Sequence, residues 1–116
     1  MKQELRIQPN HPQALYEAAD ILYGEAKLWE AEQYLLKALG VEPAMVEARL
    51  ALERIYTATG KYSKSLAELK RVSELTPEDP TPHYRMATIL RKIGKQDEAQ
   101  REMVIFTHLQ TKSTSH

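Results

Sequence analysis

Apolar and polar positions repeat along this chain with a fixed period. Three prolines, Pro9, Pro43 and Pro77, stand 34 residues apart, and the positions between them repeat in size and polarity. The apolar or small columns of this repeat are Ala18, Leu52 and Met86; Ile21, Ile55 and Ile89; Leu22, Tyr56 and Leu90; Ala31, Ser65 and Ala99; Leu35, Leu69 and Met103; and Ala38, Val72 and Phe106. Self-similarity at such a period predicts a helical solenoid, in which each repeat is one supersecondary unit.

The spacing of apolar residues within each unit predicts two helices, and therefore six helices in all. The first helices are predicted over residues 12–25, 45–59 and 80–93, and their partners over 28–40, 63–75 and 96–110. Pro12 and Pro80 suit the first helical position, where a missing N–H costs nothing, and Asp79 can cap free donors.

Two further columns predict how the helices of a unit meet. Ala26, Gly60 and Gly94 fall between the two helices, where a tight turn often needs a positive φ. Ala31, Ser65 and Ala99 are small, which predicts a close approach of two helices, because a larger side chain would be overpacked.

These columns resemble the tetratricopeptide repeat (TPR), whose pattern W-x2-L-G-x2-Y, A-x3-F and P extends over 34 residues. The second unit matches at Leu52, Tyr56, Gly60, Ser65, Leu69, Val72 and Pro77. The first matches at Leu15, Ala18, Ala19, Leu22, Ala31, Leu35, Ala38 and Pro43, and the third at His83, Met86, Ala87, Leu90, Gly94, Ala99, Met103 and Phe106. The resemblance implies an all-α fold, a right-handed superhelical solenoid of antiparallel helix pairs with about six helices.

The chain departs from the family pattern at several slots. The slot of the large aromatic residue holds Leu15, Arg49 and His83. Glu53 occupies a slot that is often glycine, and Thr111 stands where a closing proline is expected. Because Glu53 is large and charged, we expect looser packing at that slot of the second unit.

The period divides the chain into five segments. These are residues 1–11, the tail of a preceding repeat; 12–45, 46–79 and 80–111, three TPR units of which the third has an extended last helix; and 112–116, a frayed tail. Leu5 and Ile7 lie one period before Leu39 and Val41, so we hypothesise a piece cut from a longer array. The first helix would then expose the side that packs on the missing unit, which predicts end-to-end self-association.

The resemblance implies a concave groove lined by the first helix of each unit. Helical spacing then selects twelve groove residues. They are Gln13, Tyr16, Asp20, Tyr23, Glu47, Leu50, Arg54, Thr57, Thr81, Tyr84, Thr88 and Arg91. Tyrosine and arginine dominate binding hot spots, so the set predicts a groove for a peptide or a partner domain. The alternative is that Tyr16, Tyr23 and Tyr84 only cover neighbouring helices.

Charge is uneven along this predicted groove. Acidic residues precede basic ones: Glu17, Asp20 and Glu47, then Arg85, Arg91, Lys92 and Lys95. We expect an extended partner to lay its acidic portion across the third unit; the alternative is that these residues form solvated helix faces. The family's clamp for chaperone carboxylates is disfavoured, since among Tyr16, Asp20, Ala51, Thr81 and Arg85 only Arg85 agrees with it.

Composition narrows the function classes. The chain has 116 residues, with 16 basic and 16 acidic side chains and no cysteine. Zero net charge argues against a phosphate-binding surface, and together with the 34-residue period it disfavours single-stranded RNA as a ligand, so no nucleic acid is expected. No apolar run approaches the roughly 18 residues of a membrane span, so no membrane insertion is expected. The sequence does not determine the cellular compartment. A soluble cytoplasmic protein is favoured, and an exported or membrane-tethered parent is the alternative.

No catalytic motif, cofactor fingerprint or metal-ligand spacing is present. The histidines His11, His83, His108 and His116 share no i, i+4 spacing, and His83 suits a half-buried structural role. We interpret Trp29 as half-covering the inter-helix turn; an exposed tryptophan on the convex surface that marks a second contact is the alternative. The chain is therefore predicted to be a non-catalytic interaction module of a larger scaffold; alternatively, it is an accessory or regulatory spacer beside a catalytic or membrane-associated domain.

Overall fold

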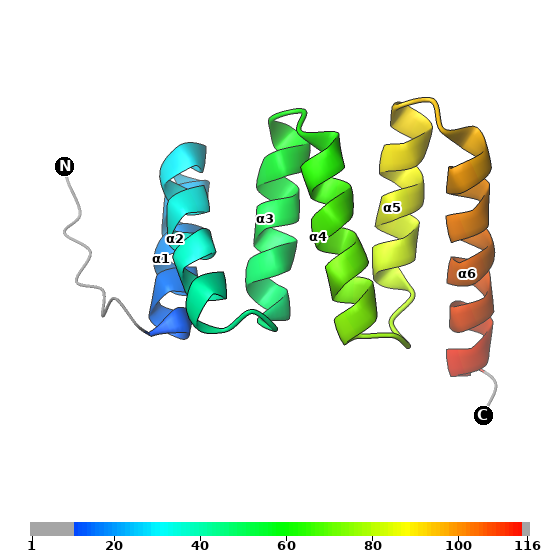
Figure 1. Ribbon diagram of the computed structural model, residues 1–116, viewed down its shortest axis with the longest axis horizontal. Helices are drawn as coiled ribbons and strands as arrows, with labels where there is room; N and C mark the ends of the chain where they lie inside the picture. Colours follow the sequence, from blue (N-terminus) through cyan, green and yellow to red (C-terminus); the bar gives the residue numbers. More distant parts are fainter. Residues whose placement is uncertain (1–10, 115–116) are drawn as a thin grey trace. The chain divides into compact units, whose positions relative to one another are not determined.

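The computed structural model describes residues 11–114, and over this range all regular structure is α-helical (Figure 1). The six helices are α1 (Pro12–Gly24), α2 (Leu28–Val41), α3 (Val46–Ala58), α4 (Tyr62–Leu75), α5 (Thr81–Lys92) and α6 (Gln96–Thr114). The all-α class and the number of helices are confirmed. Apart from His11, the predicted tail of a preceding repeat lies outside the described residues.

Helix boundaries follow the predictions closely until the last helix. Helices α1 to α5 begin and end within one residue of the expected positions. Asp79 caps α5 as expected, since its Oδ1 accepts a hydrogen bond from the Thr81 N–H at 2.9 Å. Helix α6 continues to Thr114, beyond the expected end at Gln110, so residues 112–114 are helical rather than frayed. With Thr111 in place of the closing proline, no missing N–H and no ring clash stops the helix there.

The chain divides into two compact parts, one ending at Ile55 and the other beginning at Tyr56, within α3. In the first part, α1 packs on α2. The core residues of this part are Leu15, Ala18, Ala19, Leu22, Ala31, Leu35, Ala38, Met45, Ala48, Leu52 and Ile55. Ala31 is completely buried. This burial agrees with the close helix approach that the small-residue column predicts.

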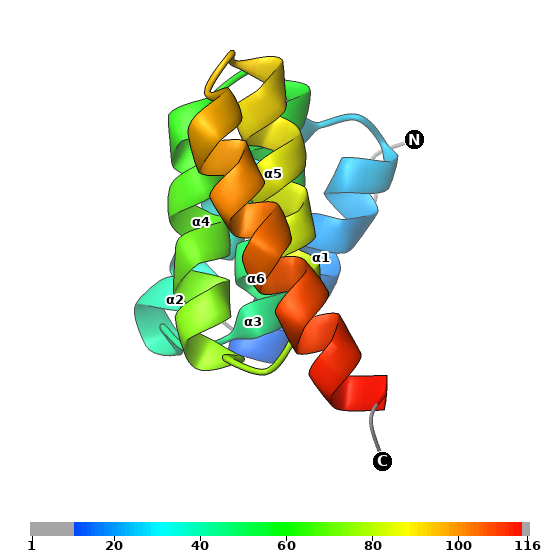
Figure 2. The same ribbon diagram turned by 90° about the vertical axis from the view of Figure 1, so that its right-hand side faces the viewer.

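In the second part, α5 packs on both α4 and α6 (Figure 2). Its buried residues are Tyr56, Ser65, Leu69, Val72, Pro82, Met86, Ala87, Ile89, Leu90 and Ala99. The hydroxyl of Thr57, near the end of α3, donates a hydrogen bond to Ser65 Oγ on α4 at 2.9 Å. The repeat columns therefore supply the core of both parts.

The three inter-helix turns share one backbone geometry. Ala26, Gly60 and Gly94 have φ angles of 62°, 75° and 85°, which confirms the expected positive φ. The amide after each of them donates to a carbonyl five residues earlier: Lys27 to Leu22 at 2.9 Å, Lys61 to Tyr56 at 2.7 Å and Lys95 to Leu90 at 2.8 Å. This bond pattern is the Schellman motif, which satisfies free carbonyls at a helix end.

Glu53 is the exception among the core positions. Its side chain is only 1% exposed, so the slot is closed rather than loosely packed. Among the described residues, no buried side-chain nitrogen or oxygen lacks a hydrogen-bond partner, and Glu53 itself has a polar or electrostatic partner. A buried carboxylate is tolerated when it is paired in this way.

Candidate partner-binding surface

None of the twelve predicted groove residues is buried. Nine are exposed: Gln13, Asp20, Tyr23, Glu47, Arg54, Thr81, Tyr84, Thr88 and Arg91. Tyr16, Leu50 and Thr57 are half-buried. Eleven of the twelve form two surfaces, which are described separately because they belong to different parts of the chain; the twelfth, Thr57, donates its hydroxyl hydrogen bond to Ser65. The first surface consists of the predicted residues on α1 and α3 as far as Arg54, and the second of those on α5 together with neighbouring residues of α6.

The first surface contains a contact between two predicted residues. The guanidinium carbon of Arg54 on α3 lies 5.7 Å from the ring centroid of Tyr23 on α1, within the range of a cation–π interaction. Tyr23 is 37% exposed, and Arg54 is exposed as well. Since each side chain restrains the other, the pair presents an aromatic edge and a planar cation that have already lost part of their rotamer freedom.

Three carboxylates lie on the same two helices as this pair. Asp20 and Glu47 are exposed, and Glu17 accepts a hydrogen bond from Gln13 Nε2 at 3.2 Å. Among the predicted residues of the first surface, Arg54 is thus the one cation, and with Glu17 the surface carries three carboxylates.

The second surface centres on Tyr84. Its ring lies 5.3 Å from the ring of Phe106 on α6, tilted by 50°, and Tyr84 remains 49% exposed. Thr88 uses its hydroxyl on its own helix, donating to the Tyr84 carbonyl at 3.1 Å, and the Thr81 amide is held by Asp79. One face of the Tyr84 ring is thus supported by an aromatic partner while the rest of the ring is available for contact.

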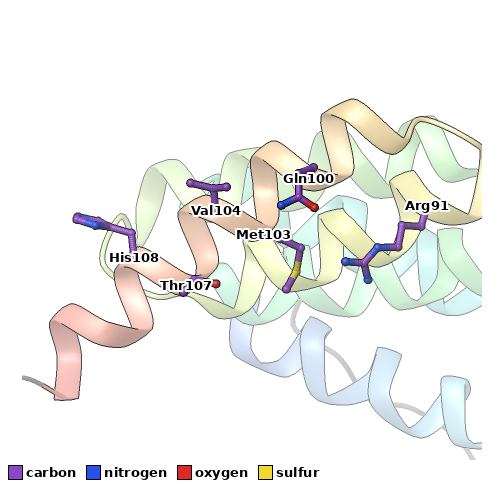
Figure 3. Close-up of a pocket in the computed structure, with 6 residues that line it drawn as sticks. All are labelled: Arg91, Gln100, Met103, Val104, Thr107 and His108. Atoms are coloured by element: carbon purple, nitrogen blue, oxygen red, sulfur yellow. The ribbon is translucent and has the colours of Figure 1, made fainter.

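Arg91 borders a hollow of about 490 Å³ beside α6 (Figure 3). Its other lining residues come from α6: Gln100, Met103, Val104, Thr107 and His108. Figure 3 shows Arg91 reaching from α5 toward Met103, with His108 farther along α6. Sequence reasoning missed the α6 residues, because it followed the family rule that first helices line the groove. The available signal was Val104, an apolar residue outside the packing columns that is 59% exposed.

The four predicted cations of the third unit do not act as one group. Lys92 places its Nζ 5.5 Å from the ring centroid of Tyr62, at the start of α4. Lys95 forms an exposed ion pair of 3.7 Å with Glu98, and Arg85 is half-buried with a partner of its own. Arg91 is the cation of this group that borders the hollow.

Two residues that the sequence singled out have other roles. His83 accepts or donates one hydrogen bond of 2.7 Å between its Nδ1 and Glu102 Oε1, and its side chain is 13% exposed, so the expected structural role agrees with its geometry. Trp29 is 71% exposed, so our interpretation that it covers the turn is wrong. Its place at the start of α2 leaves the indole in solvent.

Metal-ligand groups and membrane-spanning helices are both absent from the described residues. No group of three histidine, aspartate or glutamate side chains within residues 11–114 could hold a metal ion. In that same range, no helix has both the length and the apolar character needed to cross a membrane.

Residues 54–94 match a family model described as TPR repeat, which confirms the tetratricopeptide resemblance. No curated protein matches the chain in sequence. The crystal structure of MamA is similar, with a TM-score of 0.89 and 15% identity over 94% of this chain and 64% of that one.

Two further solved structures share the fold. MamA 41-end from Desulfovibrio magneticus RS-1 has a TM-score of 0.83 and 19% identity over 93% of this chain and 61% of that one. The type III secretion translocator chaperone SycD of Yersinia enterocolitica has a TM-score of 0.77 and 18% identity over 90% and 79% of the two chains. The chain spans about three-fifths of the length of these MamA structures. At these identities the likeness shows the fold.

Proposed function

We propose that this chain of tetratricopeptide repeats is a non-catalytic interaction module that binds a peptide or a partner domain through its first and second surfaces. The observation that carries the proposal is the pair of Tyr23 and Arg54, which are exposed on two different helices. The guanidinium carbon of Arg54 lies 5.7 Å from the ring centroid of Tyr23. Aromatic and arginine side chains that are restrained before binding are typical of hot spots, because little rotamer entropy is lost when the partner arrives.

The charges of the two surfaces favour an extended partner of mixed charge. Carboxylates dominate the first surface, whereas Arg91 and His108 border the hollow of the second. We therefore expect cationic groups of the partner on the first surface and an acidic, partly apolar portion near Tyr84 and Arg91. The structural relative SycD supports this class of function, since it is a translocator chaperone.

The test is selection of peptides from a displayed random library on the wild-type chain, followed by affinity measurement with one labelled peptide by fluorescence polarisation. Truncation of a hot-spot side chain costs about 2 kcal/mol, equivalent to roughly 30-fold in affinity. We expect a loss of that size or more for the Tyr23→Ala and Arg54→Ala double variant, and for Tyr84→Ala with Arg91→Ala. Trp29→Ala is the matched control, since it removes an exposed aromatic side chain from α2.

The alternative is that the repeats serve as an accessory spacer beside a domain outside this sequence. A spacer has no energetic hot spot on either surface, so both double variants would bind selected peptides as the wild type does. That result would contradict the proposal. A loss of binding caused by Trp29→Ala alone would contradict it too, because the contact would then lie around the exposed indole of α2.

A further inference from the structure

The face of α1 that carries Ile21 lacks the cover that its counterparts have. Ile21 is 44% exposed, whereas the residues one and two periods later, Ile55 and Ile89, are 2% and 4% exposed. Ala14, two turns earlier on the same face, is half-buried, whereas its counterpart Ala48 is completely buried. Within the described residues, then, α1 presents a packing face without its packing partner.

Helix α6 also has a packing residue that is less buried than its counterparts. Met103 is half-buried, although its counterparts Leu35 and Leu69 are 1% and 0% exposed. In the second part of the chain, α5 packs on α4, the helix that carries Leu69. Within the described residues no helix covers α6 in that way, and the hollow of about 490 Å³ lies beside Met103.

We propose that the chain associates head to tail, with α1 of one copy docked in the hollow beside α6 of another copy. In this arrangement α1 takes the place on α6 that α5 takes on α4, and Ile21 becomes buried as Ile89 is. A second copy is the occupant that fits, because the same chain carries both a half-exposed apolar face on α1 and an apolar hollow beside α6, and the charges beside them are opposite. The contact uses the hollow that borders the second surface, so a docked α1 and a peptide bound near Arg91 would compete for it.

Charge supports this pairing of unlike faces. Glu17 lies one turn before Ile21 on the open face of α1 and is exposed. The hollow on α6 is bordered by Arg91 and His108, and none of its six lining residues is acidic. A carboxylate would therefore face two basic side chains, whereas α1 against α1 would bring like charges together.

The interface is heterologous, because it joins unlike faces of two copies. A dimer therefore still has an unoccupied α1 face on one copy and an unoccupied hollow on the other. Such contacts form open chains unless the rotation between copies closes a ring. Association should thus continue beyond the dimer as concentration rises.

Sedimentation equilibrium and light scattering from roughly 10 μM to roughly 1 mM test the proposal, since a small apolar contact of this kind is weak. Wild-type mass is expected to rise with concentration. Ile21→Glu and Met103→Glu should each weaken association at least about tenfold, because the new carboxylate would be desolvated at the contact. Leu36→Glu is the matched control, since Leu36 on α2 is also 44% exposed and the substitution changes the charge equally.

The decisive sample is an equimolar mixture of the Ile21→Glu and Met103→Glu variants. The Met103→Glu variant keeps an intact α1 face, and the Ile21→Glu variant keeps an intact hollow. The mixture should therefore form dimers and nothing larger. Thermal melts verify folding, and Thr107→Glu, at an exposed residue in the hollow, replaces Met103→Glu if that variant unfolds.

Three results would overturn the proposal. The first is a wild-type chain that stays monomeric over the whole range. The second is a single variant that associates as strongly as Leu36→Glu, which indicates a symmetric contact. The third is a mixture of the two variants that stays monomeric.

Discussion

Replacing Ala26 with glycine is expected to stabilise the chain, although glycine destabilises most helical positions. Ala26 has a φ of 62°, in the left-handed region, where the Cβ of an L-residue approaches a carbonyl oxygen at a cost of roughly 1–2 kcal/mol. Glycine removes that cost but adds about 0.4–1 kcal/mol of chain entropy to the unfolded state. The net expectation is a gain of about 0.5–1 kcal/mol in the free energy of unfolding.

The reverse substitution tests the same reasoning with the opposite sign. Gly60 has a φ of 75°, and a Cβ built there meets no atom within 4 Å. Gly60→Ala therefore causes no steric clash with the rest of the chain. Its net cost of about 0.5–1 kcal/mol is the cost of the left-handed backbone less the entropy that alanine removes from the unfolded state. Gly40 lies inside α2, where a Cβ also meets no atom within 4 Å. Gly40→Ala is thus the matched control, with an expected gain of about 0.5–1 kcal/mol from helix propensity.

Urea unfolding followed by circular dichroism measures all three variants. For a chain of this size, 1 kcal/mol corresponds to a melting-temperature shift of about 4 °C. Urea midpoints are compared between variants whose free energy of unfolding falls with urea concentration at the same slope. A changed slope would indicate a change in the unfolded state instead. If Gly60→Ala and Gly40→Ala shifted the midpoint in the same direction, or if Ala26→Gly lowered it, the conformational argument would be refuted.

Two further predictions concern helix packing. Ala31→Leu should destabilise the chain by about 1–3 kcal/mol, because Ala31 is fully buried and the added atoms overpack the contact; an unchanged urea midpoint would show that the site has room. A double-mutant cycle of His83→Ala and Glu102→Ala should give a coupling of about 0.5–1.5 kcal/mol for their 2.7 Å hydrogen bond, and additive effects would mean that the contact contributes nothing.

The local backbone conformation and most helix boundaries could be predicted from the sequence. The column of Ala26, Gly60 and Gly94 predicted three left-handed turns, and all three have positive φ. Five helices end within one residue of the predicted positions, because proline, capping residues and apolar spacing act over only a few neighbouring residues. The end of α6 was misplaced at Gln110, because Thr111, unlike a closing proline, lets the helix continue to Thr114.

Contacts between helices were decided by the tertiary structure. Three contacts each join side chains from different helices: the tilted ring contact of Tyr84 with Phe106, the position of Arg54 over Tyr23, and the hydrogen bond between His83 and Glu102. Their formation depends on rotamers and on how closely the helices approach, which a period of residue types does not contain.

The hydrophobic period determined the elements and the apolar side of each helix, because residues three to four positions apart lie on one helix face. It did not determine what each exposed side chain contacts. Trp29 stands in solvent where we expected it to cover a turn, and the hollow beside Met103 involves α6, outside the helices that the family rule selects. Both depend on which neighbouring helix is present to cover a face, and that is decided only when the helices are assembled.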